Sequence, residues 1–541
     1  MTHNCQDINI KAELFQNTLL EKYKECFPVK TMKVCSEDRP WITPELKNLD
    51  RLRKREFLKN KDSKYWLKLN QKFEEKSAIM KEKYYTNIVS DLKNSNPGKW
   101  HSKLKRMSGQ DTDRNNDILV EELAGFSNQE QAEKIADHYA NISNQYSAIQ
   151  TSDFSEYQSG KWLPPTIEPI KVYETIKKMN MKAATQVNDV PIRLISEFSV
   201  ELSFPLAHIY NCCLMGGIYP NIYKCETVTP APKVFPPERL KGLRKISGLL
   251  NCSKIVEKLI GEYLIKDMAT TRDPSQYGNE KKLSIQHYLI KMLHKILVSV
   301  DKNSQNEAFA VILGMIDWAK AFDRQCHTIG VQTFIDNGVR KSLIPIMINY
   351  FQDRKMKVKW NSCKSSVKSM NGGGPQGGLI GIIEYLSQNN ECARFLPDDE
   401  RYKFIDDLSL LEILNLISVG ISSYNCKQQV PSDIQSGNHF IPTQNLKSQQ
   451  HLDKISMWTD AMKMKLNTDK SKFMIINFTR NYQFNTRLSL EGNPLRQLNE
   501  TKLLGLVLSD NLKWQSNTSL IVRKALQTDD HLAEAMGIQC P

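Results

Sequence analysis

The chain has 541 residues, of which 40% are hydrophobic and 25% are charged, and this composition excludes a long disordered protein. Its 74 lysines and arginines outnumber its 60 aspartates and glutamates, so the net charge is +14 and the pI is near 9.0. Such an excess attracts polyanions, nucleic acid first and acidic membranes second, although a solvated basic surface has the same composition.

The sequence indicates neither a secretory signal peptide nor a transmembrane segment. Its first residues lack a basic region followed by an apolar run, which predicts that there is no secretory signal peptide. No stretch reaches the ~18 uninterrupted apolar residues that a transmembrane segment requires. The 12 cysteines include no C-x-x-C pair, which argues against a zinc site. We therefore expect a protein of the nucleus or cytoplasm with no membrane partner.

Residues 45–106 are predicted to form long basic helices. Their apolar side chains recur at helical spacing, whereas lysines and arginines fill the other positions. Such charged faces favour solvated helices packed on a neighbour, but Tyr65 and Trp66 among the lysines leave contact with nucleic acid open. We assign residues 1–110 to this basic helical N-terminal region and residues 111–160 to a linker with short helices.

The middle of the chain alternates between helical and strand patterns. Helices are predicted at 127–142, 168–180, 198–216 and 328–351, and the segments TVTPAPKV and KGLRKISG are strand-and-loop elements. Residues 309–316 form a short continuous apolar run, which is typical of a buried strand. A glycine cluster at 372–378 precedes an apolar helical stretch that ends near Tyr385.

The pattern of a β-hairpin follows. Residues 402–405 and 408–411 are short apolar segments joined only by Asp406 and Asp407. For the remainder we expect a helix at 445–466 and strands at 472–478, 486–491 and 503–508.

Three aspartates stand where predicted strands end: Asp317, Asp406 and Asp407. If their strands are neighbours, the carboxylates converge, and hard oxygen ligands of this kind suit Mg²⁺. Two such ions about 3.5–4 Å apart activate a 3′-hydroxyl and stabilise a leaving pyrophosphate. A lone Asp-Asp pair is more often a simple hairpin turn. The order of the signals is what makes them specific: Asp317, then Phe322, then the loop at 374–377, then the hairpin.

In this order the motifs resemble those of reverse transcriptases of non-LTR retrotransposons, most closely those abundant in marine invertebrate genomes. MIDWAKAFD, GGGPQGGLIG and KFIDDLSLLE are similar to the family's central motifs. The resemblance implies an α+β right-hand polymerase fold with fingers, a palm with an antiparallel sheet, and a thumb, preceded by the basic helical region. Fingers and palm are expected at 161–425. The motif after the hairpin, the primer grip and a truncated thumb are expected at 426–541.

The resemblance also implies roles for individual residues. Asp317, Asp406 and Asp407 match the catalytic aspartates that bind two Mg²⁺ ions, for which Mn²⁺ substitutes. The fingers segment that binds the triphosphate has its cations at Lys233 and Arg244.

Three further residues match positions around the nucleotide. Phe322 falls at the steric gate that excludes a ribose 2′-hydroxyl, and Gln376 lies beside the incoming nucleotide and template. Lys470 matches the position of a general acid that protonates pyrophosphate.

The chain departs from the family pattern at several positions. Lys245 replaces a usual Pro, and we expect this change to loosen the nucleotide pocket. Gly378 replaces a usual Ser or Thr, and Glu280 introduces an acid into a segment that is typically basic. The last residues do not continue the expected basic thumb helices, and no endonuclease domain is expected before residue 40.

The resemblance therefore predicts an RNA-directed DNA polymerase that uses an RNA template, a DNA primer and deoxynucleoside triphosphates. The alternative is a catalytically silent retroelement remnant that only binds nucleic acid. An RNA polymerase with the same palm is disfavoured by Phe322. The sequence makes no prediction of oligomeric state.

Overall fold

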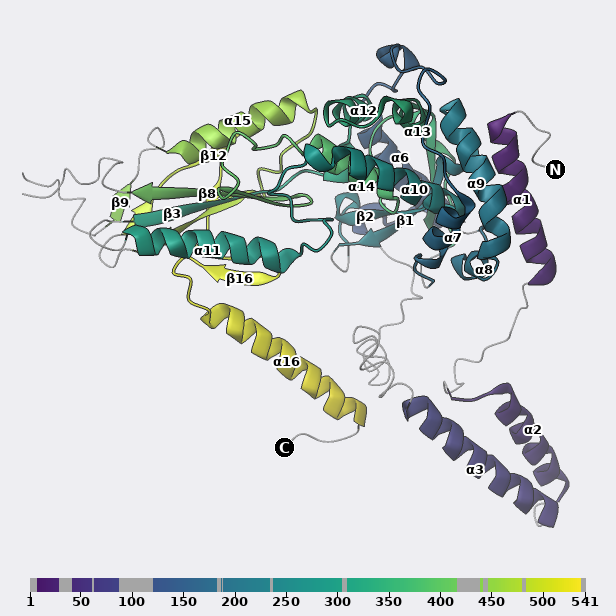
Figure 1. Cartoon of the computed structure of the whole chain (residues 1–541). Helices are drawn as coiled ribbons and strands as arrows, with labels where there is room; N and C mark the ends of the chain where they lie inside the picture. Colours follow the sequence, from purple (N-terminus) through teal and green to yellow (C-terminus); the bar gives the residue numbers. More distant parts are fainter. Residues whose placement is uncertain are drawn as a thin grey trace, which may run out of the picture. The chain divides into compact units, whose positions relative to one another are not determined.

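The computed structural model describes residues 7–28, 41–60, 63–86, 120–181, 186, 188–233, 237–303, 309–415, 438–440, 446–478 and 483–536. The chain is a mixed α/β protein (Figure 1). It divides into two compact units, of which the larger comprises Met1–Phe27 with Ile118–Trp514, and the smaller Pro28–Asp117 with Gln515–Pro541. The first helix, α1 (Ile8–Cys26), therefore groups with the larger unit.

One part of the larger unit is built on a five-stranded sheet, named the central sheet, in the order β14-β10-β3-β8-β7. Its strands are β3 (Phe309–Ile316), β7 (Arg401–Phe404), β8 (Asp407–Asn415), β10 (Lys472–Asn477) and β14 (Arg496–Gln497). β3 lies between β8 and β10 and is antiparallel to both. The predicted strand at 309–316 and the predicted hairpin at 402–411 are thus confirmed as neighbours in one sheet.

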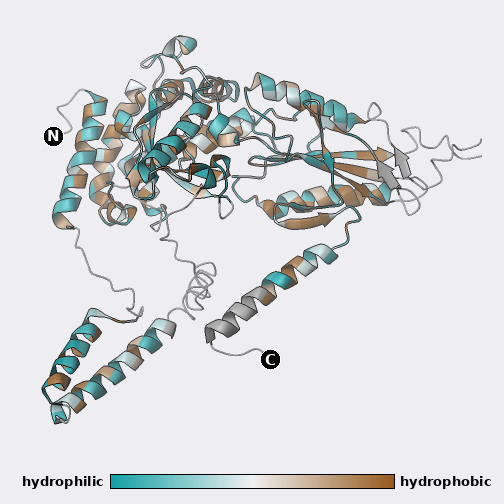
Figure 2. Ribbon diagram, turned by 180° about the vertical axis from the view of Figure 1, so that it is seen from behind, coloured by the Kyte–Doolittle hydropathy of each residue, from teal (hydrophilic) through white to brown (hydrophobic). Residues whose placement is uncertain are grey.

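Helices cover both faces of this sheet, which explains why β3 is apolar throughout. Ile312 joins a core with α15 (Lys447–Ala461), whereas Leu313 joins a core with α11 (Ile285–Asn303). Figure 1 shows these two helices on opposite sides of the strands, and Figure 2 shows the strands as largely hydrophobic. Successive side chains of a strand point to opposite faces, so burial of both faces requires an uninterrupted apolar run.

A second sheet has the order β2-β1-β4-β5, and β6 also pairs with β4. Its strands are β1 (Cys225–Pro232), β2 (Leu243–Gly248), β4 (Arg354–Trp360), β5 (Cys363–Lys364) and β6 (Lys368–Met370). Helix α6 (Asn128–Ser143) packs on this sheet, where Trp360 Nε1 donates to Gln131 Oε1 at 2.9 Å. The sheet brings the two predicted strand-and-loop segments together as the antiparallel pair β1 and β2.

A helical core completes the larger unit. Its helices are α7 (Pro169–Lys177), α8 (Ile192–Glu197), α9 (Ser199–Gly216), α10 (Asn251–Asp267), α12 (His327–Asp336), α13 (Ile344–Phe351) and α14 (Leu379–Gln388). The helical spacing predicted at 328–351 corresponds to two helices, α12 and α13, and it did not reveal the turn between them. Gly338 adopts a φ of 83° in that turn, a conformation that glycine adopts without steric strain.

The chain after residue 437 contains short strands. They are β9 (Asn438–Phe440), β11 (Gln483–Asn485), β12 (Ser489–Leu490), β13 (Asn493–Pro494), β15 (Glu500–Leu503) and β16 (Leu506–Ser509). The predicted strand at 503–508 is in fact the hairpin β15–β16, because Leu504 and Gly505 both have positive φ and reverse the chain. The predicted strand at 486–491 is shorter than expected.

In the smaller unit the described helices are α2 (Pro44–Lys59), α3 (Lys64–Thr86) and α16 (Gln515–Met536). Helices α2 and α3 pack together, with the rings of Phe57 and Trp66 5.4 Å apart. Both helices are mostly hydrophilic (Figure 2), as predicted for the basic segment. Residues 87–106 of the predicted helices and the first part of the predicted linker lie outside the described residues. None of the described helices is both long and apolar enough to cross a membrane.

Candidate active site

Three aspartates lie where β3 ends and where the β7–β8 hairpin turns, at one end of the strands of the central sheet. β3 ends directly before Asp317, while Asp406 lies in the two-residue turn of the β7–β8 hairpin and Asp407 begins β8. Because Ile316 is paired with Leu408, the end of β3 and the start of β8 are side by side. Asp317 and Asp407 line the same open pocket. The structure thus places Asp317 and Asp407 at one pocket, with Asp406 in the adjoining turn.

Burial and mutual repulsion disfavour ionisation of the two hairpin aspartates. Burial raises the pKa of Asp407 to about 6, and the charges of Asp406 and Asp317 add to this effect. Burial also raises the pKa of Asp406, with Asp317 adding to the shift and Arg244 opposing it. Like-charged carboxylates that share a site in this way are a donor set that a hard divalent cation neutralises.

The aspartates do not form a closed metal cage. Within the described ranges, no three His, Cys, Asp or Glu side chains are grouped so that they could hold a metal ion. The predicted convergence is therefore only partial in this structure, although the carboxylate oxygens and the raised pKa values of Asp406 and Asp407 fit a divalent cation.

The segment that follows α15 holds Asp317 from both sides. Asn467 Nδ2 donates to Asp317 Oδ2 at 2.8 Å, and the Asn467 N–H donates to the Asp317 carbonyl at 2.9 Å. The Asp317 N–H in turn donates to Ser471 Oγ at 3.0 Å. Sequence reasoning did not identify Asn467 or Ser471. The available signal was that Asn467 and Ser471 are small polar residues in the short segment before the buried strand β10.

Cations gather beside the carboxylates. Burial lowers the pKa of Lys233, and the charges of Lys470 and Arg244 lower it further, against the opposing charges of Asp323 and Asp317. Lys470 lines the same pocket as Asp317. The three predicted cations therefore lie within electrostatic reach of one another and of the aspartates.

The loop that contains Gln376 contacts the second sheet and the turn that follows β3. Gln376 Nε2 donates to Asp323 Oδ1 at 3.1 Å, and the Gln376 carbonyl accepts the Ser247 N–H at 3.1 Å. Phe322 packs its ring against that of Tyr385 in α14, with the ring centroids 4.9 Å apart. Asp323 is a partner of Gln376 that sequence reasoning missed.

Two of the departures from the family pattern are compensated by ion pairs. Lys245 is only 3% exposed, and its Nζ lies 2.6 Å from Glu226 Oε1, which is also buried. Its charge is thus paired within the second sheet, so the expectation that it loosens the nucleotide pocket has no support in its contacts. Glu280 forms an ion pair with Arg272.

The third departure, Gly378, precedes α14 and cannot cap that helix with a side chain of its own. Glu257 of α10 does so instead, because its Oε2 accepts the Leu379 N–H at 2.9 Å. The Tyr350 hydroxyl donates to the other carboxylate oxygen of Glu257, Oε1, at 3.2 Å. The helix that follows the glycine-rich loop is therefore anchored from a distant part of the chain.

The chain is similar to curated RNA-directed DNA polymerases of mobile elements. It is 24% identical over 418 residues to the probable RNA-directed DNA polymerase from transposon BS of Drosophila melanogaster, a match that covers 74% of this chain and 43% of the relative. It is also 24% identical over 362 residues to the RNA-directed DNA polymerase from mobile element jockey of the same organism, covering 66% and 36%. These matches bear out the resemblance to RNA-directed DNA polymerases of mobile elements, but not the likeness to those of marine invertebrates, which they do not test. The chain spans less than half the length of these relatives.

No protein-family model matches the chain. Among solved structures, it is similar to an apo telomerase from Candida Tropicalis truncated from its C-terminal domain, with 10% identity over 54% of each chain. The TM-score of 0.35 is too low to indicate a common fold.

Proposed function

We propose that the chain is an RNA-directed DNA polymerase of a non-LTR retrotransposon, which copies RNA into DNA by nucleotidyl transfer. The observation that carries this proposal is that Asp317 and Asp407 line one pocket where the end of β3 meets the start of β8, with Asp406 next to Asp407. The names of the curated relatives support the same reaction.

In this proposal the chain has a right-hand architecture. The palm is the central sheet with α11 and α15, and the fingers are the second sheet with the helical core. The primer grip and thumb lie in the chain after β10. Support comes from the antiparallel order β10-β3-β8-β7 and from helices on both faces of that sheet.

Asp317, Asp406 and Asp407 would hold two Mg²⁺ ions, or Mn²⁺ in their place. When bound, these ions would polarise the primer 3′-hydroxyl and neutralise phosphate charge. The protein then contributes mainly by fixing the positions of the reacting groups. The hydrogen bonds of Asn467 and Ser471 to Asp317 serve that purpose.

The remaining residues would act on the nucleotide. Lys233 and Arg244 bind the triphosphate oxygens by charge-assisted hydrogen bonds. Phe322, backed by Tyr385, blocks the space of a ribose 2′-hydroxyl. Lys470 donates a proton to the leaving pyrophosphate.

The partners would be an RNA template, a DNA primer and deoxynucleoside triphosphates, in the nucleus or cytoplasm. Phosphate contacts dominate the affinity for nucleic acid, so binding weakens steeply as salt rises.

Primer extension tests the proposal. Purified full-length chain is supplied with oligo-dT annealed to poly-A RNA, labelled dTTP and Mg²⁺. We expect an extended, labelled DNA product. Salt-sensitive binding of the primer-template by folded protein, without extension, contradicts the proposal and supports the silent remnant instead.

A further inference from the structure

The residue before the two hairpin aspartates adopts a strained backbone conformation. Ile405 has a φ of 58°, in the left-handed region. A β-branched side chain rarely occupies this region, because its Cβ substituents crowd the backbone there. Such a conformation persists only where the surrounding structure fixes it. Ile405 directly precedes Asp406. The contacts that fix the Ile405 backbone therefore also set the direction in which the Asp406 and Asp407 carboxylates project.

Two buried amide side chains hold Ile405 from opposite sides. Gln276 Oε1 accepts the Ile405 N–H at 3.0 Å and also the Gly278 N–H at 2.9 Å. Asn389 Nδ2 donates to the Ile405 carbonyl at 3.3 Å. Gln276 is 6% exposed and Asn389 is 2% exposed, so water is a poor substitute for either contact.

The segment that carries Gln276 runs along the hairpin. The Lys403 N–H donates to the Ser275 carbonyl at 2.9 Å, and the Tyr277 N–H donates to the Lys403 carbonyl at 2.8 Å. Gly278 approaches so closely that a Cβ atom there would stand 2.5 Å from the Ile405 nitrogen. Only glycine permits this approach of the two backbones.

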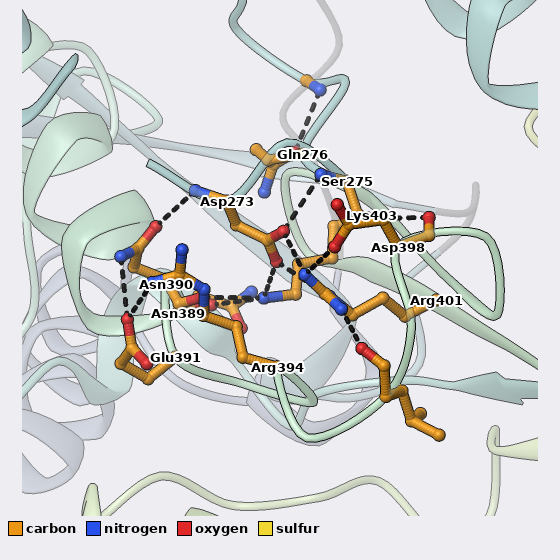
Figure 3. A network of polar contacts seen from close by, with 12 residues as sticks. Asp273, Ser275, Gln276, Asn389, Asn390, Glu391, Arg394, Asp398, Arg401 and Lys403 are labelled. Atoms are coloured by element: carbon orange, nitrogen blue, oxygen red, sulfur yellow. Dashed lines mark hydrogen bonds and ion pairs between the residues drawn. The ribbon is translucent and has the colours of Figure 1, made fainter. Parts of the chain in front are cut away.

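A buried charge network fixes this segment in place (Figure 3). Asp273 lies between Arg401 and Lys403, at 2.8 Å and 2.7 Å. Lys403 Nζ also donates to the carbonyls of Asn389 and Asn390, at 2.9 Å and 3.1 Å. The one ammonium group thus ties the Gln276 segment, the end of α14 and strand β7 together.

We propose that Gln276 is a positioning residue that holds the strained Ile405 and thereby sets the direction in which Asp406 and Asp407 project. It does not touch substrate. Its effect on synthesis rests on the proposed function, but its effect on the hairpin backbone does not.

The test compares Gln276→Met with Gln276→Glu in the full-length chain. Methionine keeps the length and apolar packing of the side chain but accepts no N–H, whereas glutamate keeps the acceptor oxygen. Hydrogen exchange, measured by mass spectrometry without substrate or metal, should be about tenfold faster in Gln276→Met for peptides that contain Ile405. The glutamate variant should retain slow exchange. Gln332→Met, an exposed glutamine on α12, is the matched control and should leave the hairpin unchanged.

Primer extension provides the second measurement. Gln276→Met should lower kcat about tenfold or more while leaving KM for dTTP unchanged, because misplaced carboxylates slow the chemistry without weakening nucleotide binding. Unchanged exchange in Gln276→Met overturns the proposal, as does faster exchange with an unchanged kcat. The wild type could make no DNA while exchange at Ile405 is still faster in Gln276→Met and slow in Gln276→Glu. In that case the positioning role of Gln276 is supported and the proposed function is contradicted.

Discussion

The carboxylate of Glu257 occupies the space that a Cβ atom on Gly378 would need. The same carboxylate caps α14 through the Leu379 N–H. Where the family pattern has Ser or Thr, this chain thus has a glycine and an acid from α10 that together perform the capping. A side chain at Gly378 would displace the Glu257 carboxylate from its position at the start of α14, so the glycine is compatible with an intact site.

The contact between Glu257 and Gly378 predicts that a substitution at one position reduces the destabilisation caused by a substitution at the other. Gly378→Ser alone should destabilise the chain by about 1–3 kcal/mol through overpacking. Glu257→Ala alone should cost about 2 kcal/mol or more, because the helix loses its cap and buried donors lose their acceptor. In the double variant the serine hydroxyl caps the helix in the space that the acid vacates. Urea unfolding should therefore show a coupling of at least about 1 kcal/mol, and simple additivity would refute the idea.

Lys245 and Glu226 allow a second test by urea unfolding. Lys245→Met leaves Glu226 buried without its ion-pair partner, and the free energy of unfolding should fall by about 3–5 kcal/mol. Adding Glu226→Met removes the unpaired charge and should recover most of the loss. If the double variant were as unstable as Lys245→Met alone, the loss of stability would not come from an unpaired Glu226 carboxylate.

Phe322 should control the choice of sugar. Phe322→Val opens space beside the ring of Tyr385, so kcat/KM for UTP relative to dTTP should rise about tenfold or more. Single-nucleotide incorporation on poly-A measures both values. An unchanged ratio of kcat/KM for UTP to that for dTTP would show that Phe322 does not control the choice of sugar.

Asp407 predicts a pH-dependent stability in the absence of divalent cations. Because its folded pKa of about 6 lies above the value of an unfolded aspartate, its ionisation destabilises the fold. That penalty is absent below about pH 4, grows between about pH 4 and pH 6, and is complete above. Asp407→Asn should thus raise the melting temperature at pH 7.5 but not at pH 3.5. The gain is on the order of 1 kcal/mol or less, because Asp407 lies among neighbouring protein atoms but still reaches solvent, which screens its charge. An equal shift at both pH values would contradict this account.

Local patterns predicted much of the fold. The strand at 309–316 was evident because both faces of β3 are buried, and the hairpin because only two residues separate two apolar segments. Where the prediction failed, a residue with positive φ redirected the chain, as at Gly338 and Leu504. A helical or strand period does not reveal such turns when the flanking residues remain apolar.

The site was predictable only in part, for a different reason. Asp317, Asp406 and Asp407 follow recognisable strands. Their supports, however, are separated from them by long stretches of chain: Gln276 lies 129 residues before Ile405, and Asn467 lies 150 residues after Asp317. Contacts over such distances depend on tertiary packing, which no local period encodes.

Removing the hairpin carboxylates is the most direct test of the central claim. Asp406→Ala with Asp407→Ala is compared with Asp336→Ala with Asp460→Ala, which removes two exposed acids on α12 and α15. Both proteins should fold and bind the oligo-dT and poly-A primer-template. We predict Mg²⁺-dependent extension by the wild type and the surface variant, and none by the hairpin variant. Undiminished extension by the hairpin variant would contradict the assignment of these aspartates as the catalytic centre.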